Sequence, residues 1–206
     1  MKTLSIPMLR CGADPDTALE LEGGVFRVDC VNWPSGYPYA PFCAGRIGHT
    51  ADSLMVDFRV SGLDLRAQNT ADQGRSWEDS ACEIFLQVPG DPGYFNFETN
   101  PAGKIVACYG PDRHSRTPLP EEKLRAISRR AWVEAPVEYA GGVWNWRVVL
   151  TIPFAVLGVK EPRRLLGNIY KCGDLTAHPH FLTWAPVGTP SPDFHRPDFF
   201  GEFIME

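Results

Sequence analysis

The fold class is decided by the stretch Trp144-Asn145-Trp146-Arg147-Val148-Val149-Leu150-Thr151-Ile152. Its apolar side chains recur at every second position, and Asn145, Arg147 and Thr151 fall between them. Successive side chains of a β-strand point to opposite faces, so this alternation is typical of a strand with one face on a core. The sequence therefore predicts a long strand whose inner face is formed by Trp144, Trp146, Val148, Leu150 and Ile152.

The same alternation recurs along the rest of the chain. It is clearest at residues 26–30, 54–60 and 82–88, and shorter candidate strands span residues 94–100, 104–109, 132–139, 165–171, 181–185 and 199–205. Turn-forming residues separate them, as in Pro89-Gly90-Asp91-Pro92-Gly93 and Ala140-Gly141-Gly142. Helix is scarce, with a short candidate at 121–130 opened by Pro120 and a single turn at 153–157.

About ten strands with little helix predict an all-β fold of two packed antiparallel sheets. No repeat of 20–50 residues is visible, which disfavours propellers and solenoids. A length of 206 residues suits one such domain, and no change in composition marks a boundary. Residues 1–206 are therefore predicted to form a single β-sandwich domain with one or two short helices.

Charge and composition exclude several classes of partner. The net charge is −5 and no run of Lys or Arg exceeds two residues, so neither nucleic acid nor an anionic membrane is expected. No segment has the length of a membrane span or the apolar core of a signal peptide. A cytoplasmic location follows by default, or a periplasmic or secreted one if a leader has been removed. The six cysteines have irregular spacings and are expected to be free thiols.

Polar residues of two consecutive strands form a candidate ligand site. Trp77 lies in a polar stretch outside the alternating pattern, and Glu83 follows on a strand whose other face is apolar. The next strand places Asn96 and Glu98 on one face. Asn and Glu are poor strand residues, so a stripe of them beside Glu83 predicts a floor that hydrogen-bonds hydroxyl groups. Two structural interpretations compete with this prediction. In one, Trp77 packs at the rim or in the core, and in the other the polar stripe is a solvated outer face of the sheet.

Several segments, in order, resemble one known family. They are Trp-Glu-Asp-Ser at 77–80 with Cys-Glu-Ile-Phe-Leu at 82–86, Tyr-Phe-Asn-Phe-Glu-Thr-Asn-Pro-Ala-Gly at 94–103, Ile-Pro-Phe at 152–154, Gly-Asn at 167–168 with Tyr-Lys-Cys at 170–172, His-Phe-Leu-Thr-Trp-Ala-Pro at 180–186 and Phe-His-Arg-Pro-Asp-Phe-Phe-Gly at 194–201. The ordered set resembles the stand-alone branch of the family 9 carbohydrate-binding modules over most of the chain.

The resemblance implies a DOMON-like, jelly-roll-like sandwich that binds sugars without cleaving them. Family members clamp a sugar ring between two tryptophans, at positions matched here by Trp77 and Trp184, while Phe181 stands where the family has an amide. The implied ligands are terminal sugars of plant-type β-glycans such as xylan or cellulose fragments, so the expected partner is an oligo- or polysaccharide. The expected binding residues are Trp77, Glu83, Asn96, Glu98, Lys104 and Trp184.

Other functional hypotheses for the same residues remain open. Glu83 and Glu98 could serve as the two carboxyl groups of a glycoside hydrolase, or the chain could be an accessory protein of carbohydrate catabolism. His178 and His180, with His195 and Cys172, are candidate metal ligands, although a surface or structural role for these histidines is favoured. No cofactor is identified, and a structural calcium would have to be held by scattered loop oxygens. An interaction protein without a ligand is the remaining alternative.

Overall fold

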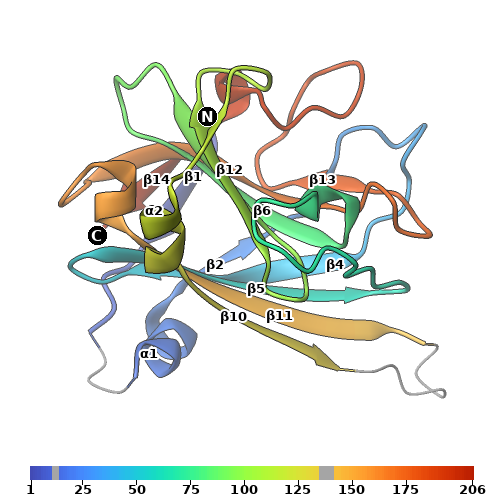
Figure 1. Cartoon of the computed structure of the whole chain (residues 1–206), viewed down its shortest axis with the longest axis horizontal. Coiled ribbons are helices and arrows are strands. Elements are labelled where there is room, and N and C mark those ends of the chain that lie inside the picture. The colour runs from blue at the N-terminus through green and yellow to red at the C-terminus, as the bar shows by residue number, and fades with distance from the viewer. Residues whose placement is uncertain (11–13, 135–141) are drawn as a thin grey trace.

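The computed structural model describes residues 1–10, 14–134 and 142–206, which contain two β-sheets packed face to face (Figure 1). Alternating sequence stretches form both sheets. The nine-stranded sheet consists of β1 (Thr3–Ile6), β3 (Cys30–Val31), β6 (Ala81–Gln87), β7 (Tyr94–Thr99), β8 (Ile105–Gly110), β9 (Thr117–Pro118), β12 (Arg164–Cys172), β13 (Phe181–Thr183) and β14 (Gly201–Met205). The five-stranded sheet consists of β2 (Gly24–Arg27), β4 (Phe42–His49), β5 (Ser53–Gly62), β10 (Ser128–Glu134) and β11 (Trp144–Pro153).

The strand order gives the fold a sandwich topology. The five-stranded sheet runs β10-β11-β5-β4-β2, and the main path of the larger sheet runs β1-β14-β12-β6-β7-β8-β9, with β13 bridging β12 and β3. Among the described strands every pairing is antiparallel except that of β1 with β14. The predicted all-β, largely antiparallel sandwich is thereby confirmed.

The core lies between the sheets and is built from the predicted alternating positions. Phe58 and Val148 of the five-stranded sheet and Ile84, Phe97 and Ile169 of the nine-stranded sheet are completely buried in one cluster. Burying such side chains contributes about 1.5–3 kcal/mol each, which makes this interface the main source of stability.

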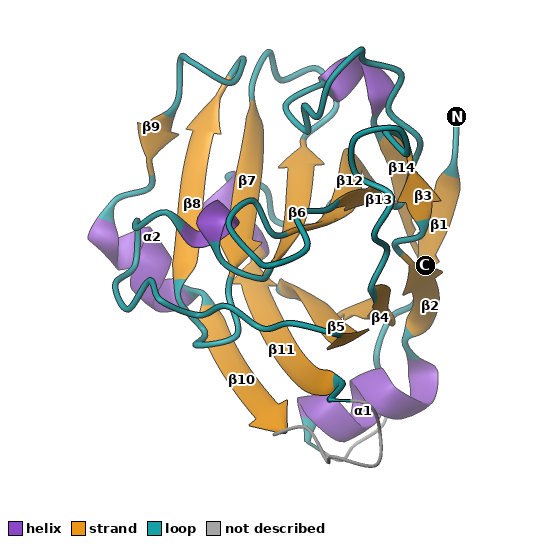
Figure 2. Cartoon of the chain, turned by 90° about the vertical axis from the view of Figure 1, so that its right-hand side faces the viewer, coloured by secondary structure: helices purple, strands orange, loops and turns teal. Residues whose placement is uncertain are grey.

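Two short helices lie within the described residues. α2 (Glu121–Ala126) follows Pro120 and lies where the chain passes from β9 in one sheet to β10 in the other (Figure 2). The prediction of a helix over 121–130 was wrong beyond residue 126, because β10 begins at Ser128 and pairs with β11. The predicted single turn is confirmed as η3 (Phe154–Leu157).

α1 (Pro15–Glu22) was not predicted from the sequence. The Asp14 side chain caps it by accepting hydrogen bonds from the backbone N–H groups of Asp16 and Thr17. Leu19 of α1 packs on Met55 and Val149, on the outer face of the five-stranded sheet. Figure 1 shows α1 lying beneath that sheet, on the side away from the nine-stranded sheet.

Some predicted features lie partly outside the described residues. The candidate strand 132–139 is observed as β10 up to Glu134, and its remaining positions, with part of the turn at 140–142, lie outside the described residues. The cysteines within the described ranges are free, and Cys11 lies outside them. None of the described helices is long and apolar enough to cross a membrane.

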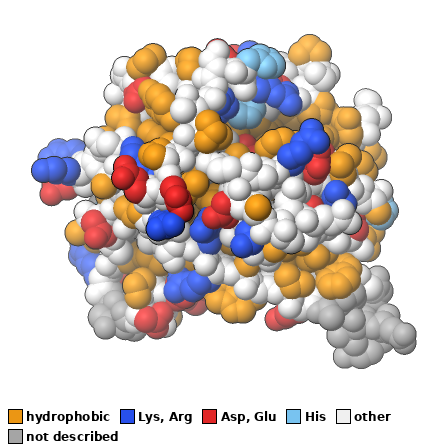
Figure 3. All heavy atoms as spheres, viewed as in Figure 1, with side chains coloured by type: hydrophobic (Ala, Val, Ile, Leu, Met, Phe, Trp, Pro, Cys, Tyr) orange, Lys and Arg blue, Asp and Glu red, His pale blue; other side chains and the backbone are white. Residues whose placement is uncertain are grey.

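The outer face of the nine-stranded sheet carries a second apolar cluster. Phe85, Tyr94 and Tyr170 project from three adjacent strands and are covered by Trp33 and Phe194 from two loops. This cluster supports the loops that surround the cavity described next. On the face of the molecule seen in Figure 3, acidic and basic side chains are intermixed and neither sign dominates.

Candidate functional site

A cavity of about 470 Å³ lies on the outer face of the nine-stranded sheet. Its floor comes from β6, β7, β8 and the end of β12. Its walls come from the turn at residues 75–77, from the start of β13, and from loops that follow β8 and β12 or precede β14. Trp77, Glu83, Asn96 and Glu98 all line it. The structure therefore brings four of the six sequence-predicted site residues together.

The floor follows from strand register. Glu83 on β6 pairs directly with Glu98 on β7, and Asn96 lies two positions along β7 on the same face. Directly paired side chains of an antiparallel sheet have Cβ atoms about 4.5–5.5 Å apart. The two carboxyl groups therefore share one patch of the floor, as the polar stripe in the sequence predicted.

Burial controls the protonation of both carboxyl groups. Glu83 is 3% exposed and accepts a hydrogen bond from the Cys172 thiol at 3.0 Å. Burial, reinforced by the neighbouring Glu98, raises the pKa of Glu83 well above its usual range. Glu98 is 5% exposed, and burial raises its pKa to about 7. At neutral pH the floor therefore carries only a fraction of the negative charge that two ionised carboxylates would have.

Glu98 has one oxygen committed to the protein and one without a partner. Its Oε1 accepts a hydrogen bond from the Asn96 amide at 2.7 Å, whereas its Oε2 is buried and has no hydrogen-bond partner among the described residues. An unsatisfied buried polar atom costs about 1–3 kcal/mol, so a cavity that contains one is prepared for a ligand or water that completes it.

Arg116 holds the other side of Asn96. Its Nε and Nη2 donate to the Asn96 side-chain oxygen at 2.8 and 2.5 Å, and its guanidinium lies 4.3 Å from the centre of the Tyr94 ring. The Asn96 amide is thus fixed in orientation between Arg116 and Glu98. Such a chain of bonds presents donors and acceptors with little loss of side-chain entropy on binding.

Trp77 lies at the rim, in the short helix η1 (Ser76–Glu78), and is half-buried. Its carbonyl accepts a hydrogen bond from the backbone N–H of Asp174 at 3.2 Å, which ties the turn to the loop after β12. The Arg75 guanidinium lies 5.9 Å from the centre of its ring. The indole is therefore partly open to the cavity and its backbone is fixed.

Asp79 fixes the same turn from below. It is fully buried and accepts hydrogen bonds from the backbone N–H groups of Gln68 and Asn69 at 3.0 and 2.9 Å and from the Asn100 amide at 2.9 Å. Burial alone would raise the pKa of Asp79, but these hydrogen bonds outweigh it and lower the pKa. The aspartate therefore stays charged and joins three loops beneath Trp77.

Comparisons with known proteins assign the fold to a family. A family model described as carbohydrate-binding family 9 matches residues 16–205. The chain belongs to carbohydrate-binding family 9. The crystal structure of a candidate carbohydrate-binding protein from Bacteroides uniformis ATCC 8492 superposes with a TM-score of 0.89 at 33% identity, covering 100% of this chain and 99% of that one.

Two further structures extend the comparison within family 9. They are of a family 9 module from Caldicellulosiruptor kristjanssonii in complex with glucose and in complex with cellotriose. Each has a TM-score of 0.61, with 12% and 13% identity, and the matches cover 100% of this chain and 96% and 94% of those chains. At that identity the likeness shows the shared fold. No protein with a curated description matches the sequence.

Trp184 does not form part of this family 9 cavity, and its expected role as the second sugar-binding face was wrong. It is 2% exposed, its ring centre lies 5.4 Å from that of Phe203, and it belongs to the core between the sheets. A Cβ atom at Gly201 would lie 2.5 Å from its ring, so the indole packs closely against that backbone. The cause is strand parity, because Leu182 and Trp184 both point inward from the β13 segment.

Phe181 has the opposite parity and lines the cavity. Its ring stands edge-on to Phe194 with centres 6.1 Å apart, and Phe194 stacks on Tyr170 at 4.2 Å. Both phenylalanines reach the wall of the cavity. The position at which the resemblance implied an amide therefore supplies an aromatic surface in this family 9 chain.

Lys104, the expected cation, also lies outside the cavity. It sits in the turn between β7 and β8, where its backbone N–H donates to the Asn100 side chain at 2.9 Å. Arg113 and Arg116 line the cavity instead, in the loop after β8. Their signal in the sequence was a basic loop, 113–116, directly after a strand next to the polar stripe.

The histidines do not converge on a metal. His180 is buried between the Lys171 ammonium and the carbonyl of His178, each at 2.7 Å, and burial, aided by Lys171, lowers its pKa to about 2. His195 pairs with the Tyr94 hydroxyl at 2.9 Å, and burial lowers its pKa to about 3. No group of three His, Cys, Asp or Glu side chains among the described residues is arranged to hold a metal ion.

Proposed function

We propose that the cavity over β6 and β7 binds a terminal sugar residue of a β-linked glucan or xylan fragment without cleaving it. The observation that carries the proposal is the half-buried Trp77 beside the unpartnered Glu98 Oε2 and the fixed Asn96–Arg116 pair. The cavity thus combines an apolar flat surface with a cluster of oriented polar groups.

Pyranose sugars have this same division of surface. Their C–H-rich faces pack on aromatic rings, and their equatorial hydroxyl groups donate to and accept from planar carboxyl, amide and guanidinium groups. Covering about half of one indole, on the order of 75–100 Å², contributes roughly 2 kcal/mol. After the cost of association, one such face with a few hydrogen bonds suits micromolar to millimolar affinity.

The sugar clamp proposed here differs from one made of two tryptophans. Trp77 covers one side of the ring, and the phenylalanine wall of Phe181 and Phe194 replaces the buried Trp184. A phenyl ring offers less area than an indole, so we expect affinity for a single sugar nearer the weak end of that range. The glucose and cellotriose complexes of the Caldicellulosiruptor module support a glucan fragment as the first ligand to test.

Titration calorimetry with glucose, cellotriose and xylotriose tests the proposal. Cellotriose is expected to bind with a stoichiometry of one and to quench tryptophan fluorescence, and Trp77→Ala is expected to weaken binding while the protein stays folded. Absence of binding to all three sugars at millimolar concentration contradicts the proposal.

A second candidate function is glycoside hydrolysis, and the pKa of about 7 for Glu98 is the observation that favours it. A carboxylic acid that holds its proton near neutrality is what a general acid requires. Release of reducing sugar from cellotriose or an aryl glycoside, abolished by Glu98→Gln, would establish that activity. The register pairing of Glu83 and Glu98 on one floor, rather than on opposite sides of a bound ring, favours binding.

A further inference from the structure

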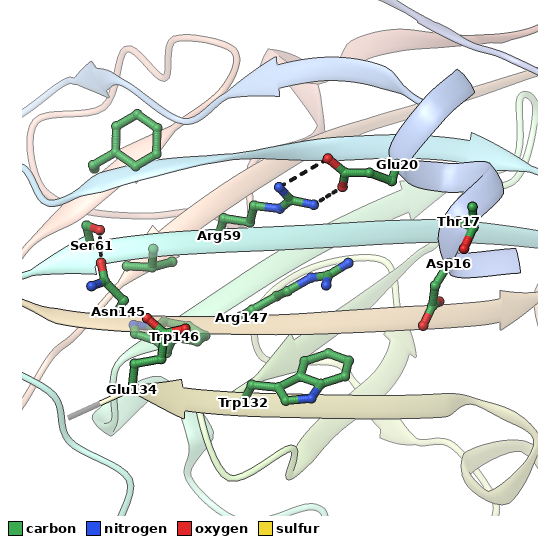
Figure 4. Close-up of a pocket in the computed structure, with 12 residues that line it drawn as sticks. Asp16, Thr17, Glu20, Arg59, Ser61, Trp132, Glu134, Asn145, Trp146 and Arg147 are labelled. Carbon is green, nitrogen blue, oxygen red and sulfur yellow. Dashed lines mark hydrogen bonds and ion pairs between the residues drawn. The ribbon is translucent and has the colours of Figure 1, made fainter. Parts of the chain in front are cut away.

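A groove of about 680 Å³ crosses the outer face of the five-stranded sheet, on the side of the sheet that faces away from the core. α1 covers one part of this face through Leu19, and no other described helix covers the part toward Phe42 and Glu134. Figure 4 shows the side chains of Arg59, Arg147 and Trp132 standing over β5, β11 and β10, with α1 forming a wall beside them. The floor of the groove is therefore a sheet and one of its walls is a helix.

Strand register arranges the floor in two rows. Trp132, Arg147 and Arg59 are paired across β10, β11 and β5. The next row runs through Glu134, Asn145, Ser61 and Phe42, as the pairings with β4 complete it. Each row thus has an exposed aromatic side chain at one end, Trp132 in the first row and Phe42 in the second, and polar side chains along the rest of its length.

Trp132 is held as an open platform. The exposed fraction of Trp132 is 44%, and the Arg147 guanidinium lies 5.1 Å from the centre of its ring. Arg147 is in turn held by Asp57, which is 1% exposed and accepts from the Arg147 Nε at 2.7 Å. A large aromatic surface that is exposed on a polar sheet face and contacted by a fixed neighbouring guanidinium is prepared to stack with a ligand.

Free hydrogen-bonding groups surround that platform. Arg147 uses only its Nε, so its two terminal nitrogens have no hydrogen-bond partner among the described residues. Asn145 is exposed and accepts a hydrogen bond from the Ser61 hydroxyl, and its amide N–H groups have no partner among the residues that the structure describes. A fixed guanidinium fork beside an amide suits the adjacent hydroxyl groups of a sugar ring.

The charges of the groove select against an ionic ligand. Asp57 pairs with Arg59 and Arg147, Glu20 of α1 pairs with Arg59, and Asp16 pairs with Arg130. These carboxylates and guanidinium groups compensate each other, so the groove offers oriented donors and acceptors without a strong net field. A neutral ligand with many hydroxyl groups and apolar ring faces meets that requirement.

We infer that this groove is a second glycan-binding site, which takes an internal segment of a neutral polysaccharide chain while the cavity on the other sheet takes a terminal sugar. The open sides of the groove let a polysaccharide chain continue past Trp132. The walled cavity only has to hold the end of a chain. The two sites lie on opposite outer faces of the sandwich, so one chain can be held at two points, or two chains can be joined.

Affinity electrophoresis in gels that contain barley β-glucan, hydroxyethylcellulose or xylan tests the inference. Long polysaccharides have few chain ends, so a cavity for terminal sugars contributes little retardation. The parent protein and Trp77→Ala are expected to be retarded in at least one gel. Trp132→Ala is expected to bind about tenfold more weakly, and Asn145→Ala to bind more weakly than the parent.

Val25→Ala, which trims an exposed apolar side chain of β2 in the same sheet, is the matched control and is expected to behave as the parent. Trp132→Ala should keep the parent's calorimetric affinity for glucose and cellotriose. If those sugars do not bind, the proposed function of the cavity is contradicted. The retardation of the parent and of Trp132→Ala in the gels still tests the groove.

Three outcomes overturn the inference. One is that no polysaccharide retards the parent protein, and another is that Trp77→Ala abolishes the retardation while Trp132→Ala does not. The third is that the parent sediments as a dimer and Trp132→Ala as a monomer, because the groove would then be an interface between copies of the chain.

Discussion

Two tryptophans that look alike in the sequence have opposite environments in the fold. Trp77 is half-buried at the rim of the cavity, on a turn held by Asp79, whereas Trp184 is packed against Phe203 in the core. Trp184 points into the core because of its parity in the β13 segment, whereas Trp77 lies in the short helix η1, where strand parity does not apply. Under the proposed function, Trp77 is the one of the two that is placed to contact a sugar.

Alanine substitution separates these roles. Trp77→Ala is expected to weaken cellotriose binding by roughly 1–3 kcal/mol, the contribution of one aromatic face, with a small effect on thermal unfolding. Trp184→Ala is its matched control and should lower the free energy of unfolding by about 3–5 kcal/mol, since it leaves a cavity in the core. Calorimetry and thermal denaturation measure both effects. Equal loss of stability in the two variants would contradict the assignment.

The proposed role of Glu98 predicts that sugar binding depends on pH. The pKa of Glu98 is about 7 without a ligand, and its unpartnered Oε2 would accept a ligand hydroxyl more strongly when it is charged. Affinity for cellotriose is therefore expected to rise by up to about tenfold between pH 6 and pH 8, as the ionised fraction grows. Calorimetry across this range measures the effect. Glu98→Gln should have a flat profile, and an unchanged slope in that variant would assign the titration to another group.

At the level of elements, the sequence predicted those whose pattern is regular. The alternation at 54–60 and 144–152 became β5 and β11, and the polar stripe of β7 became the floor of the cavity. α1 escaped prediction because it is eight residues long and buries only Ala18 and Leu19, too few positions to show a helical period.

The predicted site was less accurate than the predicted strands, for a physical reason. Strand periodicity fixes which face a side chain occupies, and Glu83, Asn96 and Glu98 were placed correctly by it. Loops have no such period, so Arg113 and Arg116 were missed and Lys104 was chosen in their place. Trp184 was misplaced by the family resemblance, although its shared parity with the apolar Leu182 pointed to the core.

The turn that carries Trp77 depends on Asp79. Asp79→Ala removes the acceptor for donors from two loops, at Gln68 and Asn69 and at Asn100, and is expected to lower the free energy of unfolding by about 3–5 kcal/mol. Because the turn loosens, cellotriose affinity should fall as well. Asp198→Ala is the matched control, since it breaks an exposed pair with Arg196 and should cost about 0–1 kcal/mol. Urea denaturation compares the two, and similar costs would show that Asp79 does not organise the loops.

At the scale of the whole molecule, the two sheets share one core and present two different outer faces. The nine-stranded sheet carries buried carboxyl groups in a walled cavity, and the five-stranded sheet carries compensated ion pairs in an open groove. The shared core between the sheets fixes the position of each face relative to the other. Under the two proposals, a terminal sugar and an internal chain segment would therefore bind at separate places on one small protein.

The buried carboxyl groups of the cavity should also shape the stability of the whole fold. The pKa of Glu98 is about 7 in the folded protein, against an ordinary value of 4.5. The folded state therefore binds the proton more tightly than the unfolded state, and this contribution to stability is complete below pH 4.5 and is lost as pH rises to about 7. The full effect is about 3–4 kcal/mol, because one pKa unit corresponds to about 1.4 kcal/mol.

Other groups titrate in the same range, so the measurement is a difference between two proteins. Burial raises the pKa of Asp174 to about 6, which acts in the same direction, whereas the buried neutral His180 destabilises the fold as pH falls below its ordinary value of 6.5. Both groups remain in Glu98→Gln and cancel in the comparison. Urea denaturation at pH 5 and pH 8 should show the variant gaining stability relative to the parent at the higher pH. An equal difference at both pH values would mean that Glu98 ionises in the fold as it does in water.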